Sequence, residues 1–289
     1  MAYFSADSVQ ELSISGIEAI TASIEIQTVT KRLQQLHEKL YAQMKLQNLN
    51  LHILTPNVAT VIPSSVSTVE DGGALCVAYL RQATEAVMVE RLMGREEVAS
   101  VHKVEAHRHP VIEIRLGSDG LAVELILSPD AWWDQQNLAG KLGIARHRQE
   151  FYAMLQQLAS DYRMGFWRGT HLSEMHLTAN QFQHPRIMDE WMSTFEPGAD
   201  WWRMGVWFDY DDDALSEDEI DTTLLKNIRS LYGFYDHMRW TGDNNYRGFH
   251  AESEPNLETR ICLILPYFKQ HLNQPDTHVP FCTDIIVHR

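Results

Sequence analysis

The sequence of 289 residues has no run rich in lysine and arginine. Its formal net charge is -15, from 39 acidic and 24 basic residues, so we expect an acidic surface. Such a surface repels phosphate backbones, which argues against general nucleic-acid binding. The same charge keeps a protein soluble, which is the simpler explanation of the composition.

Cysteine is scarce and long apolar runs are missing. The three cysteines, Cys76, Cys262 and Cys282, have no Cys-x-x-Cys spacing, so we expect buried thiols in a reducing compartment. The longest apolar runs, such as residues 261–268, are too short to cross a bilayer, and the first residues lack the features of a signal peptide. The sequence therefore predicts a soluble, cytoplasmic protein that does not enter a membrane.

Familiar catalytic motifs are also missing. There is no glycine-rich phosphate loop and no Gly-x-Ser-x-Gly elbow, which argues against a nucleotidase or a serine hydrolase of familiar kind. No family resemblance extends beyond a few residues. Whether the chain is an enzyme is therefore left open.

The most informative feature is a six-residue phrase that occurs twice. YRMGFW at 162–167 returns 40 positions later as WRMGVW at 202–207. Alternate residues of an extended chain share a face. We therefore predict two strands of one sheet, with a common buried face made by Met164, Phe166, Met204 and Val206.

The opposite face of this repeat carries arginine, glycine and tryptophan in both copies. If the strands are neighbours, Gly165 and Gly205 leave a floor without side chains, the tryptophans form a wall and the arginines supply fixed donors. We predict a groove for a small anionic or aromatic ligand, bound by Arg163, Trp167, Arg203 and Trp207. The alternative is that this face lies under a helix, with the arginines paired to carboxylates such as Glu190 or Asp189.

A predicted hairpin, with strands at 111–116 and 121–127, offers a first metal site. A turn at 117–120 places Glu113 opposite Glu124, and two opposed carboxylates destabilise a sheet unless a positive charge lies between them. His107 and His109 share the face of Glu113, and alternate residues of a strand can converge on a metal. The predicted ligands are His107, His109, Glu113 and Glu124. The alternative is that Arg115 neutralises the glutamates and the histidines are solvated.

A second group that could hold a metal is His171, Glu174 and His176. Its spacing matches neither His-Glu-x-x-His nor the inverted motif, but the three side chains could converge in a loop. Either group would suit a divalent metal.

Helical and strand patterns alternate along the chain. Apolar residues recur at helical spacing from about residue 17 to 47, after a capping box at Ser15 and Glu18. We predict an α+β fold with a mixed sheet, a central antiparallel hairpin, helices packed on the sheet and a long N-terminal amphipathic helix. Residues 1–289 are taken as one compact domain, in which 1–95 could be a subdomain.

Three functions remain open at this point. The first is a binding or interaction protein whose groove is floored by strands 162–167 and 202–207. The second is a metal-dependent hydrolase that uses the histidine and glutamate groups. The third is a structural subunit that docks through its N-terminal helix. A protein partner and a homo-oligomer are compatible with all three.

Overall fold

The structure, a computed structural model, describes residues 2–4, 24–53, 60–68, 73–95, 98 and 103–247. The chain divides into two compact units, Met1–Tyr246 and Arg247–Arg289, and the architecture below is that of the first. Its described residues form six α-helices and seven strands, with the helices packed on a sheet, which confirms the α+β class.

One sheet contains all of the described strands, in the order β1-β2-β3-β4-β7-β5-β6. Every pairing among them is antiparallel, so the sheet is antiparallel rather than mixed as predicted. The strands are β1 (Ile62–Pro63), β2 (Leu75–Tyr79), β3 (Val111–Gly117), β4 (Gly120–Leu127), β5 (Arg163–Phe166), β6 (Leu177–Thr178) and β7 (Trp202–Phe208).

The predicted hairpin is β3 and β4. Gly117 pairs with Gly120, so the turn itself is only Ser118 and Asp119, and Gly120 has a φ of +132°, which favours glycine. The expected register is confirmed, with Glu113 directly opposite Glu124. The face that carries these glutamates is buried, however, and not solvated as predicted.

The predicted long N-terminal helix is confirmed by α2, which ends within one residue of the expected position at about 47. The predicted capping box at Ser15 and Glu18 and the apolar run at 261–268 fall outside the described residues. Within the described part of the chain, no helix is both long and apolar enough to cross a membrane. The helices are α2 (Ile24–Leu46), α3 (Ala83–Leu92), α4 (Trp132–Leu142), α5 (Ala145–Leu155), α6 (Pro185–Met192) and α7 (Ile220–Met238).

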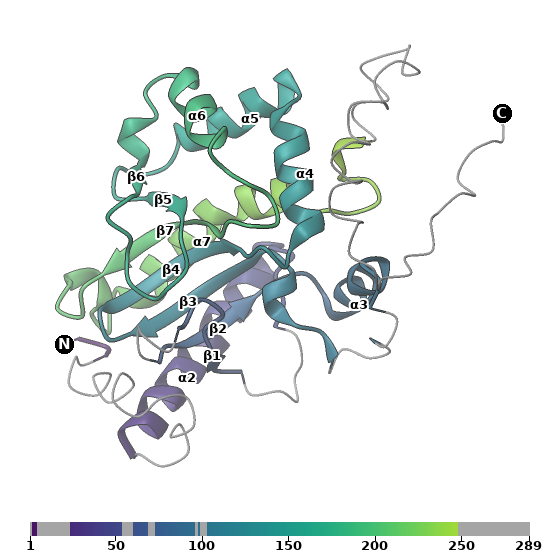
Figure 1. Cartoon of the computed structure of the whole chain (residues 1–289). Helices are drawn as coiled ribbons and strands as arrows, with labels where there is room; N and C mark the ends of the chain where they lie inside the picture. Colours follow the sequence, from purple (N-terminus) through teal and green to yellow (C-terminus); the bar gives the residue numbers. More distant parts are fainter. Residues whose placement is uncertain are drawn as a thin grey trace, which may run out of the picture. The chain divides into compact units, whose positions relative to one another are not determined.

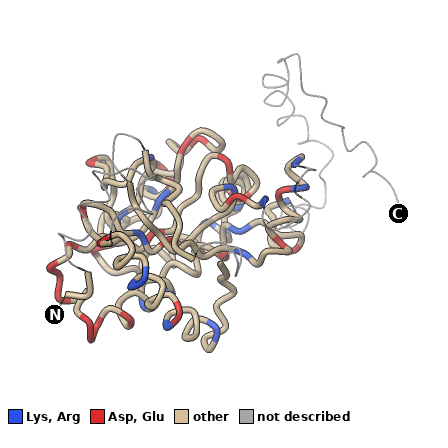
Figure 2. Tube along the Cα trace, turned by 90° about the horizontal axis from the view of Figure 1, so that it is seen from below, with Lys and Arg blue, Asp and Glu red and all other residues tan. Residues whose placement is uncertain are grey.

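Helices α2 and α7 cover one face of the sheet, and loops cover the other. Helix α7 packs on β3, β4 and β7, and α2 packs on β2 and α7, which creates a large apolar core. In Figure 1 the loop between β5 and β6 crosses the opposite face of the sheet. Lysine and arginine are scattered along the described trace (Figure 2), as the absence of a basic run predicted. The two faces of the sheet therefore differ: one is apolar and covered by helices, and the other carries charge.

Candidate functional site

The two copies of the repeat form neighbouring strands, β5 and β7, as predicted. They run antiparallel, and Met164, Met204 and Val206 are buried in the core, with Phe166 packed against it. Each arginine lies opposite the glycine of the other copy. The register pairs Arg163 with Gly205, Met164 with Met204, and Gly165 with Arg203.

Glu124 is the centre of the charged face. It lies on β4 opposite Gly205, and it is fully buried together with Arg115 and Arg203. Arg203 donates from Nε and Nη2 to its carboxylate at 2.6–3.1 Å, and Arg115 donates from Nε and Nη2 at 3.1 and 2.5 Å. Such charge-assisted bonds between planar groups fix the geometry of all three side chains.

Glu113, the second carboxylate of this face, is held by hydroxyl groups. Ser64 Oγ donates to its Oε2 at 2.6 Å, and Ser65 Oγ donates to its Oε1 at 2.8 Å. The four buried charged side chains, Glu113, Glu124, Arg115 and Arg203, have charges that sum to zero, which favours their burial as a group. The expectation that Arg115 neutralises the glutamates holds for Glu124, with which it forms an ion pair, but no ion pair joins it to Glu113, and His109 is buried rather than solvated.

The same arginines hold the loops that cover the face. Arg115 Nη1 donates to the carbonyl oxygen of Thr170 at 2.6 Å, and Arg203 Nη1 donates to that of Gly169 at 2.5 Å. The backbone N–H of Gly169 in turn donates to the carbonyl of Val66 at 3.2 Å. The cover consists of loops, not of the helix that the alternative prediction proposed.

The carboxylates suggested as partners of the repeat arginines lie elsewhere. Glu190 pairs with Arg186 at 2.8 Å, and Asp189 lies 3.7 Å from Arg148. Arg203 of β7 pairs instead with Glu124, which lies on the neighbouring strand β4. This part of the alternative prediction was wrong because helix α6 does not lie over the charged face.

The two glycines of the repeat do not form an open floor. A Cβ atom at Gly205 would lie 2.3 Å from the carbonyl oxygen of Val123, and one at Gly165 would lie 3.0 Å from the ring of Trp167. These glycines therefore allow close approach of a neighbouring strand and an aromatic ring. A surface hollow of about 270 Å³ lies elsewhere, between α4, α5 and α6.

The remaining predicted ligand-binding residues lie side by side. The guanidinium carbon of Arg203 lies 4.5 Å from the centroid of the Trp167 ring. The centroids of the Trp167 and Trp207 rings are 5.9 Å apart. Both tryptophans are partly exposed. Arg163 is also partly buried, yet its side chain makes no hydrogen bond or ion pair with a described residue. Its repeat mate Arg203, in contrast, is buried and fully engaged.

The first predicted metal group is dispersed by the structure. His107 lies 3.5 Å from Glu105 and 3.4 Å from Asp130, whereas His109 is buried 3.3 Å from Glu90 Oε1. Glu113 and Glu124 are bound to the serines and arginines of the charged face. Pro110 and the short 3-10 turn at 106–108 break the strand before it reaches the histidines.

The second predicted metal group does not converge either. His171 faces Asp119 at 3.4 Å, and His176 Nδ1 bonds the carbonyl of Ser173 at 2.6 Å, while Glu174 is exposed. Across all described residues, no cluster of three His, Cys, Asp or Glu side chains is placed to hold a metal ion.

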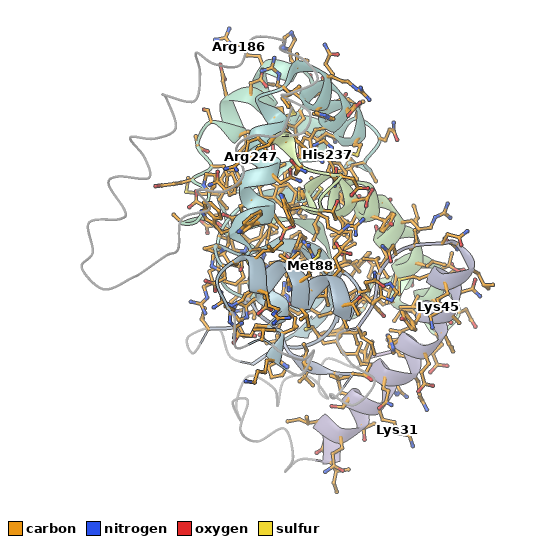
Figure 3. The ribbon with its side chains drawn as sticks, turned by 90° about the vertical axis from the view of Figure 1, so that its right-hand side faces the viewer. Lys31, Lys45, Met88, Arg186, His237 and Arg247 are labelled. Carbon is orange, nitrogen blue, oxygen red and sulfur yellow. The ribbon has the colours of Figure 1, made fainter. Side chains whose placement is uncertain are left out.

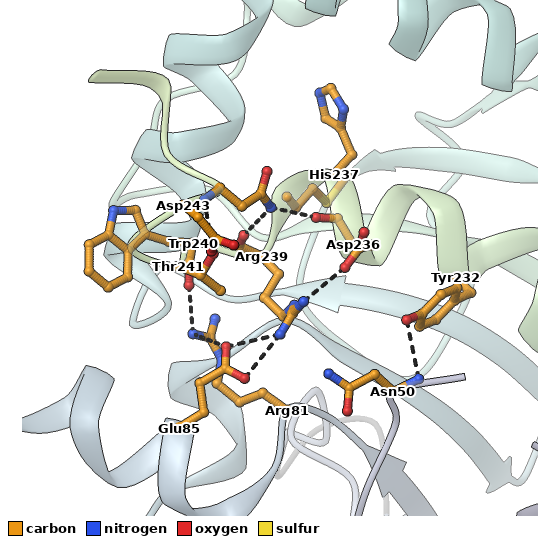
Figure 4. A network of polar contacts seen from close by, with 12 residues as sticks. Asn50, Arg81, Glu85, Tyr232, Asp236, His237, Arg239, Trp240, Thr241 and Asp243 are labelled. Atoms are coloured by element: carbon orange, nitrogen blue, oxygen red, sulfur yellow. Dashed lines mark hydrogen bonds and ion pairs between the residues drawn. The ribbon is translucent and has the colours of Figure 1, made fainter. Parts of the chain in front are cut away.

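A charged cluster that the sequence reasoning missed lies where β2 ends. Arg81 is buried there and bonds Asp134 of α4, and its Nη1 donates to the carbonyl of Trp240 at 2.9 Å. Glu85 of α3 receives Arg239 Nη1 on both oxygens at 3.0 Å (Figure 4). These contacts connect β2, α3, α4 and the end of α7, and we call Arg81, Glu85, Asp134 and Arg239 the ionic cluster.

Three polar residues of α4 point inward and hold the last turn of α7 and the residue Trp240 that follows it. Asp134, Asn137 and Lys141 recur at helical spacing on one side of the helix. Asn137 Nδ2 donates to the carbonyl of Met238 at 3.1 Å, and Lys141 Nζ donates to that of His237 at 2.7 Å. The helical spacing of these three polar residues is visible in the sequence. Polar residues are mostly exposed, however, so the spacing alone does not predict a buried cluster.

The buried ring of His237 predicts a pH-dependent stability. Burial, with the charges of Lys141 and His147, lowers the pKa of His237 from 6.5 to about 3. Since the folded pKa lies below the unfolded one, the stabilisation is complete above pH 6.5 and is lost as the pH falls from 6.5 towards 3. As the pH falls from 6.5 to 4.5, this histidine should lower the free energy of unfolding by roughly 2–3 kcal/mol.

Denaturant titrations across this pH range check the prediction. His237→Phe keeps a ring against Phe151 but cannot be protonated, so its unfolding free energy should fall less steeply than that of the wild type. The exposed His171→Gln serves as the control and should keep the wild-type slope. Equal slopes for wild type and His237→Phe would contradict the assignment.

The comparisons with known proteins do not assign the chain to a family. The sequence matches no protein-family model, and no curated protein is significantly similar to it. The function therefore has to be argued from the geometry.

Proposed function

We propose that this chain is a binding protein whose ligand docks against β5 and β7, on the guanidinium of Arg163 and the rings of Trp167 and Trp207. The observation that carries the proposal is the state of Arg163. It is partly buried on the strand pair that carries the two partly exposed indole rings, and no described residue supplies an acceptor for its side chain. Its guanidinium nitrogens are not among the buried unpartnered atoms, so they reach solvent and are available to an acidic group of a ligand.

The neighbouring carboxylate cannot serve Arg163. Glu124 lies one strand beyond Gly205, the cross-strand partner of Arg163. It already accepts five hydrogen bonds from Arg115 and Arg203, whereas a carboxylate offers about four lone-pair sites. The two arginines of the repeat are therefore assigned different roles. Arg203 stabilises the buried ion pairs of the charged face, and Arg163 contacts the ligand.

The surrounding side chains define the class of ligand. A guanidinium pairs best with a planar carboxylate or a phosphate, and indole rings favour a flat or apolar body. These features support a small molecule that joins an anionic group to an aromatic ring.

Tryptophan fluorescence during titration with benzoate tests the proposal. Benzoate should change the emission of the wild-type protein, and Arg163→Gln should weaken binding at least tenfold, because a hydrogen bond to a charged group contributes about 1.5–3 kcal/mol. Inorganic phosphate, which has the charge without the ring, should bind more weakly than benzoate.

Arg186→Gln is the matched control. Arg186 lies on α6, away from β5 and β7, where it pairs with Glu190, and its side chain is 80% exposed (Figure 3). This variant should bind benzoate like the wild type. Equal affinity in Arg163→Gln and the wild type, or no response of the wild type to either anion, would refute the proposal.

A further inference from the structure

A surface hollow of about 270 Å³ lies where α4, α5 and α6 meet, and none of its lining residues belongs to β5 or β7. Helix α5 packs on both α4 and α6 (Figure 1), and the chain passes from α4 to α5 through Gly143 and Ile144 alone. Ligand pockets usually measure about 300–1,000 Å³, so a hollow just below this range suits a small molecule.

The inner wall of the hollow is apolar. Leu142 comes from the end of α4, Met188 and Met192 lie one turn apart on the same side of α6, and Phe195 follows α6. Leu142, Met188 and Phe195 are at most 9% exposed and belong to the hydrophobic core, against which Met192 packs. Because methionine side chains are unbranched and flexible, this wall can adapt to an aliphatic group.

The rim of the hollow carries one positive and one negative side chain that are only loosely paired. Arg148 Nε and Asp189 Oδ1 are 3.7 Å apart, which is too far for a hydrogen bond. The two side chains are 43% and 44% exposed, and neither makes another ion pair or side-chain hydrogen bond with a described residue. An exposed pair of this kind contributes little to stability, so both groups can exchange it for contacts with a ligand.

The opposite charges of the rim restrict the class of ligand. A carboxylate pairs best with the guanidinium of Arg148, and an ammonium group pairs with the carboxylate of Asp189. An α-amino acid carries both groups on one carbon, next to its side chain, so it can contact both charges at once. No side chain caps the start of α5 and no acidic residue lies in its first turn, so the helix dipole also favours a carboxylate beside Arg148.

We propose that the hollow binds a free apolar α-amino acid such as leucine, with its carboxylate on Arg148, its ammonium group on Asp189 and its aliphatic side chain against Met188 and Met192. A molecule with only one of the two charges loses one contact and brings its charge close to a like charge of the rim. The site is separate from the tryptophan site on β5 and β7 and does not depend on it.

Methyl spectra of the full-length protein labelled at methionine test the site with L-leucine as the probe. The methyl signals of Met188 and Met192 should shift during titration, whereas that of Met44, which is buried on α2, should not. 4-Methylpentanoate lacks the ammonium group and leucinamide lacks the carboxylate, so each should bind at least about tenfold more weakly than leucine. No shift at Met188 and Met192, or equal affinities for the three compounds, would overturn the proposal.

Three variants separate the contributions of charge and space. Arg148→Gln and Asp189→Asn should each weaken leucine binding at least about tenfold, with little change in melting temperature because the pair is exposed. Ala139→Leu should block binding by filling the hollow, while both charges remain. The control is Arg146→Gln, since Arg146 lies on α5 but outside the hollow, is 80% exposed and pairs with Glu150. Wild-type affinity in any of the three variants, or an equal loss in Arg146→Gln, would contradict the assignment.

Discussion

Gly205→Ala should abolish stable folding or cost about 3 kcal/mol or more, the upper end of the range for overpacked sites. The added methyl group would lie 2.3 Å from the carbonyl oxygen of Val123 and 2.8 Å from the Cα of Glu124. Both are backbone atoms of β4, which is paired on both sides and cannot withdraw. Denaturant unfolding of the purified variant measures the loss.

Gly242→Ala is the control for this substitution. A Cβ atom at Gly242 would meet nothing within 4 Å, so the change should leave stability almost unaltered. Gly165→Ala should lie between the two, since its neighbours are the Trp167 ring at 3.0 Å and the carbonyl of Met175 at 3.1 Å. A Gly205→Ala protein as stable as Gly242→Ala would show that β4 and β7 are not so closely packed.

Glu124→Gln should lower the unfolding free energy by about 3–5 kcal/mol, the cost of removing one partner from a buried ion pair. The substitution keeps the shape of the side chain but leaves Arg115 and Arg203 buried without their counter-charge. Because the same arginines bind the carbonyls of Thr170 and Gly169, the covering loop should also loosen. Thermal and denaturant melts measure the first effect, and hydrogen exchange at residues 167–171 measures the second.

Glu190→Gln provides the matched comparison. It removes one partner of an exposed pair with Arg186, in which both side chains are more than half exposed. Exposed pairs contribute at most about 1 kcal/mol, so the loss should be small. An equally small loss of unfolding free energy in Glu124→Gln would show that the buried ion pairs of Glu124 with Arg115 and Arg203 contribute little to stability.

Much of the fold was predictable from local pattern. The repeat identified β5 and β7, and alternation of apolar residues identified β3 and β4 together with the register that opposes Glu113 and Glu124. These predictions succeeded because strand period and turn length determine which residues face each other. The antiparallel order of the whole sheet was not predictable, since it depends on contacts between residues far apart in the chain.

The charged face was misjudged for a physical reason. Polar alternation on a strand ordinarily marks a solvent face, so the sequence predicted an exposed groove and exposed metal ligands. Here the polar residues neutralise one another, and loops cover them through carbonyl groups that carry no sequence signal. Arg203 therefore became a buried support, and Ser64 and Ser65, which hold Glu113, could not be recognised in advance.

The central claim is that the two arginines of the repeat differ in role, and thermal melts of Arg203→Gln and Arg163→Gln test it most directly. Arg203→Gln breaks a buried ion pair and should lower the melting temperature by about 10 °C, given a cost of about 3–5 kcal/mol and about 2–4 °C per kcal/mol for a domain of this size. Arg163→Gln removes a guanidinium without a partner and should leave the melting temperature unchanged or raise it. Equal falls in both variants, or no fall in Arg203→Gln, would contradict the account.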